Sequence, residues 1–168
     1  MQFVAVAGLP GSGKTTVAKI VEKRGYVYMS MGDVVRAVAQ KTGMTPDKVA
    51  VFMRLEKGRR AVVKHILETA KGERFVIDGL RSPEELDALE EVGKTFLIYV
   101  VASKRTRYAR LYSRGRSDDP LTYSQFLMRD LRELKFGLAD LLARADYIVV
   151  NENKTIEQLE EELSLLVI

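Results

Sequence analysis

The sequence predicts an α/β fold, built as a five-stranded parallel sheet with helices on both of its faces. Three observations lead to this prediction. Short apolar segments rich in β-branched residues alternate with segments of helical spacing along the chain. Residues 95–102 are apolar without polar alternation, which is typical of a strand buried on both faces. A glycine-rich turn joins the first apolar segment to the first helical one.

The first half of the chain contains three of the predicted strands. Gly25 ends the first helix, and Thr45 with Pro46 begins a long helical stretch as its N-cap and first-turn proline. Gly58 lies inside that stretch and is expected to weaken or break it, because glycine is a poor helix former. In order, the elements are strand 3–7, helix 14–23, strand 26–30, helix 32–41, helical stretch 45–71 and strand 74–78.

The second half continues the alternation. Ser82 and Pro83 begin a helix as cap and first residue, and two glutamates follow in its first turn. Then come strand 95–102, a basic helix 104–114, a turn-rich break 115–120, helix 122–143, strand 147–150 and helix 155–166. The last helix carries four apolar residues at helical spacing, which predicts that they pack in the core: Ile156, Leu159, Leu163 and Leu166.

Length and composition favour one globular domain over residues 1–168. The chain is 46% hydrophobic and 30% charged, which is ordinary for a folded domain. It has no cysteine, so a disulfide framework, a thiolate metal site and a cysteine nucleophile are excluded. No apolar run is long enough for a membrane span and no basic leader is seen, so we expect a cytoplasmic protein. The net charge of +4 is modest and makes nucleic acid an unlikely partner.

The glycine-rich turn has the full P-loop (Walker A) signature, between a predicted strand and a helix. It reads Gly8-Leu9-Pro10-Gly11-Ser12-Gly13-Lys14-Thr15, followed by Thr16. Glycines let the backbone curl so that its N–H groups and the helix N-terminus face phosphate oxygens. The signature predicts that Lys14 reaches the β- and γ-phosphates of ATP and that the Thr15 hydroxyl coordinates Mg²⁺. The cofactors expected are therefore ATP and Mg²⁺.

Asp78 ends a predicted buried strand, where ligands of open α/β sheets bind. A carboxylate there can hold Mg²⁺ through its water shell, as the second acid of a P-loop enzyme does. The alternative is that Asp78 only opens the turn made with Gly79, which is a common use of aspartate. The upstream P-loop favours the metal role.

With these motifs in order, the sequence resembles the P-loop nucleoside monophosphate kinases, and adenylate kinase in particular, over essentially its whole length. Residues 30–36 are similar to that family's Ser-Thr-Gly-Asp-x-x-Arg segment, and residues 78–81 to its Asp-Gly-Phe-Pro-Arg turn. The resemblance implies that Asp33 and Arg36 shape the acceptor site and that Arg36 and Arg81 hold the acceptor's phosphate. It also implies an acceptor-binding arm over about 30–72.

The same resemblance covers the donor side. Arg110 and Arg114 are similar to the paired arginines on the helix that enters the family's lid, where the first covers the ATP base and the second meets phosphates. Residues 116–119, with Arg129 further on, look like the lid exit. The resemblance therefore implies a short lid over about 113–121 and a catalytic set that neutralises the transferring phosphate: Lys14, Arg114, Arg116 and Arg129.

Several positions depart from the adenylate kinase pattern. Met31 replaces the family's threonine, which leaves the acceptor base open, and the turn at Asp78 lacks one residue and its proline. Almost nothing separates Arg114 from Arg116, so the lid is minimal. The tail 145–151 resembles dephospho-CoA kinase instead. The sequence is most similar overall to an adenylate-kinase-related archaeal group without an assigned acceptor.

The expected function is transfer of the ATP γ-phosphoryl to a small phosphorylated acceptor, with a nucleoside monophosphate as the first candidate. Phosphorylation of a hydroxyl, as in dephospho-CoA kinase, is one alternative, and Asp33 is then the candidate base. An ATPase or regulatory module acting on RNA or protein is another. The remaining basic residues are interpreted as surface or structural groups: Arg54, Arg59, Arg60, His65, Lys104 and Arg105.

Overall fold

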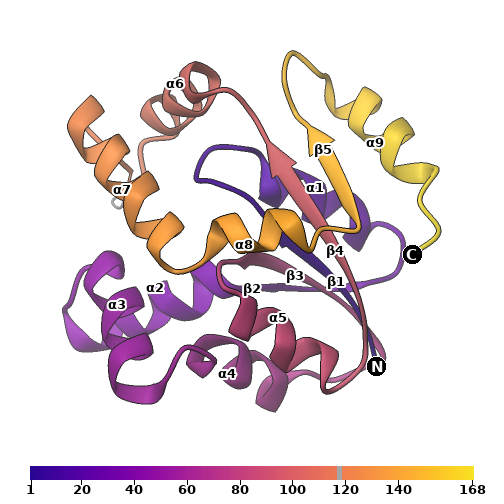
Figure 1. The fold of residues 1–168 in the computed structure, drawn as a ribbon, viewed down its shortest axis with the longest axis horizontal. Helices are drawn as coiled ribbons and strands as arrows, with labels where there is room; N and C mark the ends of the chain where they lie inside the picture. Colours follow the sequence, from indigo (N-terminus) through magenta and orange to yellow (C-terminus); the bar gives the residue numbers. More distant parts are fainter. Residues whose placement is uncertain (117–118) are drawn as a thin grey trace.

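A computed structural model describes residues 1–116 and 119–168. Figure 1 shows a central sheet with helices on both sides and both termini at the same end of the molecule. The strands are β1 (Gln2–Ala7), β2 (Val27–Ser30), β3 (Arg74–Leu80), β4 (Lys94–Val101) and β5 (Tyr147–Val150). The helices are α1 (Lys14–Glu22), α2 (Met31–Thr42), α3 (Pro46–Lys57), α4 (Ala61–Thr69), α5 (Pro83–Glu90), α6 (Lys104–Arg114), α7 (Tyr123–Lys135), α8 (Leu138–Ala143) and α9 (Ile156–Ser164).

The sheet is parallel throughout and has the strand order β2-β3-β1-β4-β5, which confirms the predicted fold class. Strand β1 lies at the centre, with β3 on one side and β4 on the other. The chain turns from one half of the sheet to the other next to β1. In open α/β sheets a ligand crevice forms at such a switch point, beyond the carboxyl ends of the strands. The glycine-rich turn that follows β1 lies there.

Two hydrophobic cores hold the layers together, one on each face of the sheet. Strand residues 3, 5, 7, 75, 77, 97 and 99 pack against α2, α3, α4, α5 and α8. Strand residues 4, 6, 76, 98, 100 and 149 pack against α1 and α9. Alternate residues of β1 therefore enter opposite cores, as the period of two in a strand requires. This explains why the buried stretches of the central strands are apolar at consecutive positions: 3–7, 75–77 and 96–101.

Glycine divides two of the helical stretches that the sequence suggests. Gly58, at φ 86°, separates α3 from α4, as its position within 45–71 indicates. The expectation of one continuous helix over 122–143 is wrong, because Gly137, at φ 102°, separates α7 from α8. The last helix buries Leu159 and Leu163 in the second core. The core assignment of Ile156 is wrong, since it is 55% exposed at the first turn.

The assignment of Arg54 to the surface is also wrong. Its side chain is 6% exposed, and Nη2 lies 2.6 Å from Oε1 of the fully buried Glu85. Nη1 donates to the carbonyl of Ala50, and the guanidinium lies over the ring of Phe136. Glu85 Oε2 accepts the backbone N–H of Arg81. This buried pair therefore connects α3 to α5 and fixes the turn that carries Arg81.

No helix within the described residues is both long enough and apolar enough to cross a bilayer.

Replacing Arg54 with Ala should lower the free energy of unfolding by about 3–5 kcal/mol, because Glu85 would be left as an uncompensated buried charge. Urea denaturation measures this difference. Arg59→Ala is the matched control: Arg59 pairs with Glu84 at the surface, with 59% of its side chain exposed, and should cost less than about 1 kcal/mol. Equal small losses in both variants would show that the buried pair does not hold α3 to α5.

Candidate active site

The P-loop connects the end of β1 to the start of α1 across residues 8–13. Gly13 has φ 100°, and a Cβ on it would lie 2.1 Å from Nδ2 of Asn151. Gly8 has φ 144°, and its Cβ would lie 2.3 Å from the carbonyl oxygen of Val100. Both positions therefore need glycine for conformation and for space. The loop can pass close under the end of the sheet only because these side chains are absent.

Side chains from outside the loop bind its carbonyl groups. Arg107 Nη1 donates to the carbonyl of Pro10 at 3.1 Å, and Arg110 Nη1 donates to those of Gly11 and Ser12 at 3.3 Å. Asn151 Nδ2 also donates to Ser12, at 2.8 Å. With its carbonyls held outward, the loop can turn N–H groups toward the cleft, beside the N-terminus of α1. Such an arrangement is suited to binding phosphate.

Lys14 is the first residue of α1 and lies in the floor of the cleft. Its Nζ donates to the carbonyl of Leu9 at 3.1 Å. Burial lowers the pKa of Lys14 to about 8, an effect that the charges of Asp78 and Glu133 oppose and those of nearby arginines reinforce. The ammonium is therefore poorly solvated in the absence of a ligand, and an anion beside it would favour its charged form.

Asp78 stands beside Thr15 at the end of β3. Its Oδ2 accepts hydrogen bonds from the Thr15 hydroxyl at 2.7 Å and from the Tyr28 hydroxyl at 2.8 Å. Its Oδ1 is buried and has no hydrogen-bond partner in the described part of the chain. Burial and the adjacent carboxylate raise the pKa of Tyr28, so that the phenol stays protonated as a donor.

The Thr15 and Asp78 oxygens fit a magnesium ion that is also bound by phosphate. Mg²⁺ usually takes one or two protein oxygens and fills its other positions with water and phosphate. The buried, unpartnered Oδ1 of Asp78 is an oxygen that such an ion or its water shell would satisfy. Within the described residues, no cluster of three or more His, Cys, Asp or Glu side chains forms a metal site by itself. The arrangement therefore suits a metal that arrives with a phosphate ligand.

A second group of charged residues lies between α2, α3 and α7. Arg36 Nη2 lies 2.5 Å from Asp33, and Arg81 Nε lies 3.2 Å from Oε2 of Glu133. Burial raises the pKa of Glu133, but the charges of Arg81, Arg132, Lys14 and Arg129 outweigh this, and the net pKa is lowered. Glu133 is therefore an ionised carboxylate within a cluster of cations.

The predicted lid is described except for Ser117 and Asp118, which lie outside the described residues. Asp119 is buried and binds Arg114 through both of its oxygens, at 2.5 and 2.8 Å, and Arg129 at 3.2 Å. Burial raises the pKa of Asp119, but its hydrogen bonds with Arg114 and Arg116 and the nearby charges lower it overall. Asp119 therefore holds together two of the arginines that the resemblance placed in the donor site.

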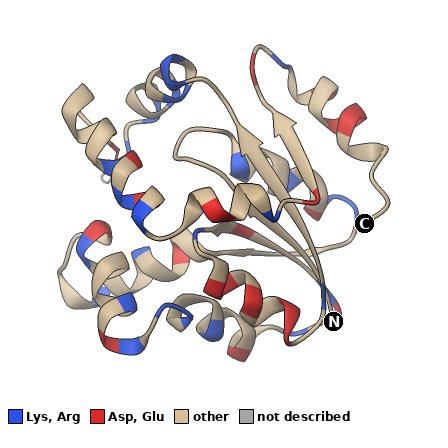
Figure 2. Cartoon of the chain, in the orientation of Figure 1, with Lys and Arg blue, Asp and Glu red and all other residues tan. Residues whose placement is uncertain are grey.

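One cleft with about 580 Å³ of open space brings most of the predicted site residues together. Its lining includes Gly8, Pro10, Gly11, Lys14, Thr15, Arg36, Asp78, Arg81, Arg114, Arg116, Arg129 and Glu133. An adjoining space of about 720 Å³ is lined by Gly13, Thr16 and Arg110 as well. The basic segments that converge there, mainly α6 and α7, are blue in Figure 2. Asp33 is not among the described residues that line either space, and its side chain is 66% exposed.

Sequence reasoning missed several residues that shape this cleft. Glu133 follows Arg129 by four residues, so the two share a helix face, which is a signal that was available. Asn151 directly follows the last strand, a position that also indicates the site. Asp130 and Tyr28 carry no local signal. Arg107, within the basic helix predicted over 104–114, is buried and forms two hydrogen bonds with Asp130, at 2.7 and 2.8 Å.

Comparison with known proteins shows the family of this chain and agrees with its fold. Residues 7–123 match the family described as AAA domain. A UPF0200 protein of Pyrobaculum aerophilum is 67% identical, with 97% of this chain and 95% of the relative covered. A UPF0200 protein of Methanothermobacter thermautotrophicus is 40% identical, with 90% of this chain and 82% of the relative covered. The chain belongs to the UPF0200 family. This UPF0200 protein has the α/β fold that its sequence predicted, with the P-loop at the end of the first strand.

Solved structures show the same fold for the UPF0200 chain at low sequence identity. Shikimate kinase from Bacteroides thetaiotaomicron superimposes with a TM-score of 0.64 at 19% identity, covering 96% of this chain and 94% of that one. Shikimate kinase from Acinetobacter baumannii superimposes with a TM-score of 0.61 at 17% identity, covering 96% of this chain and 90% of that one. At these identities the likeness establishes the fold and leaves the acceptor open.

In the UPF0200 protein, Asp78→Asn should raise the Mg²⁺ concentration at half-maximal activity by about tenfold or more, because one acidic oxygen beside Thr15 is lost. ADP binding measured in EDTA should change little. Tyr28→Phe keeps the carboxylate but removes a hydrogen bond to it, and should shift the midpoint less. If the Mg²⁺ concentration at half-maximal activity were unchanged in Asp78→Asn, Asp78 would not bind the metal and would only form the turn with Gly79.

ADP affinity in EDTA should be nearly constant below pH 8 and fall above it, by about tenfold between pH 7 and 9. Lys14, with a pKa of about 8, must carry its proton to meet phosphate, so unliganded protein that has lost the proton binds weakly. Calorimetry at each pH gives the affinity. The variant Lys14→Met should bind more weakly with no such decline. Wild-type affinity that stays constant up to pH 9 would show that Lys14 does not meet the phosphates in this way.

Proposed function

We propose that this UPF0200 protein is an ATP- and Mg²⁺-dependent phosphotransferase that moves the γ-phosphoryl group to a small phosphorylated acceptor. The observation that carries the proposal is the convergence of six cationic side chains from separate segments on one cleft: Lys14, Arg36, Arg81, Arg114, Arg116 and Arg129. Phosphoryl transfer needs little covalent chemistry from the protein. It needs positioning and neutralisation of charge on the transferring oxygens.

The proposed roles divide between the two sides of the cleft. On the donor side, P-loop N–H groups and Lys14 would hold the ATP phosphates, and Thr15 and Asp78 would hold Mg²⁺, which supplies charge neutralisation there. Arg110 binds the loop and lines the adjoining space, where it would contact the nucleotide. Arg114 and Arg116 of the short lid, together with Arg129 of α7, would close over the phosphates. On the acceptor side, Arg36 and Arg81 would hold an anionic group.

A nucleoside monophosphate is the first acceptor proposed, because the segments 30–36 and 78–81 resemble the acceptor segments of adenylate kinase. In that case the attacking group is an anionic phosphate and no base is needed. The cytoplasm, the expected location, contains the nucleotides that this reaction uses.

A hydroxyl acceptor is the second candidate, and one observation favours it. The buried carboxylate of Glu133 lines the cleft beside Arg81, where it would repel a phosphate and could accept a hydroxyl proton. Structural neighbours of this fold are named as kinases of shikimate. An ATPase or regulatory module remains the alternative from a different class.

Arg116→Ala separates a kinase from an interaction module. In a kinase the lid arginine contributes most in the transition state, so kcat should fall by roughly 10³-fold or more while ATP affinity falls far less. The measurement is ADP formation with and without an acceptor, next to ATP binding by calorimetry. Arg105→Ala, on the exposed side of α6, is the control and should keep normal turnover.

Two results would count against the kinase proposal. One is ATP turnover that no phosphorylated acceptor increases. The other is an Arg116→Ala protein that keeps its turnover but loses binding to RNA or protein.

A further inference from the structure

The two acceptor chemistries call for different groups in the cleft, and one residue distinguishes them. We infer that the acceptor reacts through a hydroxyl group and that Glu133 receives its proton. This inference rests on the proposed phosphotransferase function and names the reacting group of its acceptor. The anionic part of the acceptor, a phosphate or carboxylate, is then bound by Arg36 and Arg81.

Glu133 occupies the junction between donor and acceptor sides. It lines the main cleft together with Lys14 and also lines the smaller space between α2, α3 and α7. Its side chain is 5% exposed. Oε2 is 3.2 Å from Arg81 Nε, whereas Oε1 is 3.8 Å from Arg132 Nη2, too far for a hydrogen bond. Oε1 therefore retains the capacity to accept a hydrogen bond from a hydroxyl in the cleft.

The negative charge of Glu133 would oppose an acceptor phosphate that has to approach the γ-phosphate of ATP. Carboxylate and phosphate repel each other in a buried site, and that repulsion is strong where water does not screen it. A neutral hydroxyl meets no such repulsion and is oriented by the same carboxylate. The placement of Glu133 beside Lys14 thus disfavours phosphate and favours hydroxyl as the attacking group.

The lining of the acceptor-side space suits an acid better than a nucleotide base. The space is narrow and is lined by arginines, carboxylates and small apolar residues: Gly32, Val35, Arg36, Pro46, Asp47, Ala50, Arg81, Arg129, Arg132 and Glu133. No aromatic ring is among these described lining residues, so the space offers no surface on which a base could stack. An ion pair of 2.7 Å between Arg132 and Asp47 joins α7 to α3 across it.

Glu133 is better placed than Asp33 to act as the base. The Asp33 carboxylate is largely exposed and forms an ion pair with Arg36 on its own helix, and it does not line the described cleft. Glu133 is held by an element on the opposite side of the cleft, α7. Its lowered pKa keeps it ionised near neutral pH, so that it is ready to accept a proton.

The step conserves atoms and charge. The acceptor hydroxyl oxygen forms a bond to the γ-phosphorus, and the bond from that phosphorus to the β,γ-bridging oxygen breaks. ADP leaves with the bonding electron pair, and the hydroxyl proton passes to Glu133 and then to water. The products are a phosphate monoester, ADP and one proton. A nucleoside monophosphate attacking through its phosphate would instead give a phosphoanhydride.

Phosphorus NMR distinguishes these products for any acceptor. The protein is incubated with ATP·Mg²⁺ and, separately, with each of the five common nucleoside monophosphates, dephospho-CoA, D-ribose 5-phosphate and glycerol 3-phosphate. Formation of a new monoester supports the inference. Fast formation of a nucleoside diphosphate overturns it and leaves the phosphotransferase function intact. Transfer to none of these compounds above the rate of ATP hydrolysis counts against the proposed function instead.

Glu133→Gln tests the role of the carboxylate in every one of these cases. Glutamine keeps an amide oxygen where the carboxylate now contacts Arg81 Nε, so a purely positioning role would leave kcat near normal. A base role predicts a fall in kcat of about 10²–10⁴-fold with little change in acceptor KM or ADP affinity. Where water is the only acceptor, ATP hydrolysis should fall likewise, and unchanged hydrolysis overturns the inference. Glu90→Gln, at an exposed ion pair with Arg144, is the control and should keep normal activity.

Discussion

Positive charge gathered in one cleft is the constraint on which the rest of this structure depends. Lys14 and five arginines line a single space, and without compensation they would repel one another. Carboxylates of the chain compensate them: Asp119 binds Arg114 and Arg129, Glu133 binds Arg81, and Asp33 binds Arg36. These four arginines are thereby held in position before any ligand arrives. A phosphate chain entering the cleft meets cationic groups that are already oriented, which reduces the ordering cost of binding.

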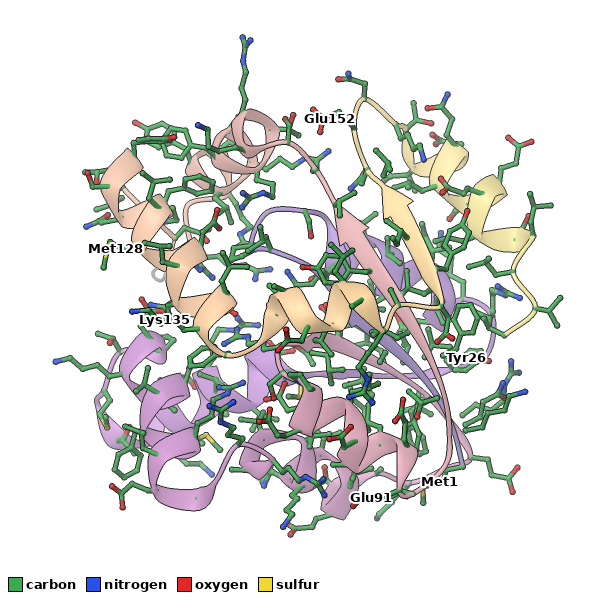
Figure 3. The ribbon with its side chains drawn as sticks, in the orientation of Figure 1. Met1, Tyr26, Glu91, Met128, Lys135 and Glu152 are labelled. Atoms are coloured by element: carbon green, nitrogen blue, oxygen red, sulfur yellow. The ribbon has the colours of Figure 1, made fainter. Side chains whose placement is uncertain are left out.

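Helix α7 shows how this constraint shapes an element. Apart from the fully buried Phe126, its inward face is polar: Arg129 and Glu133 line the cleft, and Asp130 binds Arg107, which in turn supports the P-loop at Pro10. Its outward face carries apolar residues, among them Met128, which Figure 3 shows pointing away from the molecule and which is 65% exposed. The helix therefore reverses the usual pattern of an apolar inner face, because its inner side serves a charged site and not a hydrophobic core.

The fold was predictable from local signals, whereas part of the site was not. Apolar β-rich segments, capping residues such as Thr45 and Ser82, and the P-loop glycines each specify backbone conformation within a few residues. The burial of Arg54 depends on Glu85, 31 positions away, and the break at Gly137 depends on a left-handed residue that a helical pattern hides. Tyr28 reaches Asp78 only because β2 pairs with β3. Contacts made by topology leave no pattern in one sequence, and the roles assigned to the acceptor arginines and to Asp33 stay predictions.

Because six cationic side chains line the cleft, the affinity for ATP should come from its phosphates. Competition against a fluorescent ATP analogue in the presence of Mg²⁺ tests this most directly. Inorganic tripolyphosphate and ADP should displace the analogue from wild-type protein and much less well from Lys14→Met, whereas adenosine should displace it poorly from either. If adenosine displaced the analogue as effectively as ATP and tripolyphosphate did not displace it, the phosphates would not be the source of the affinity.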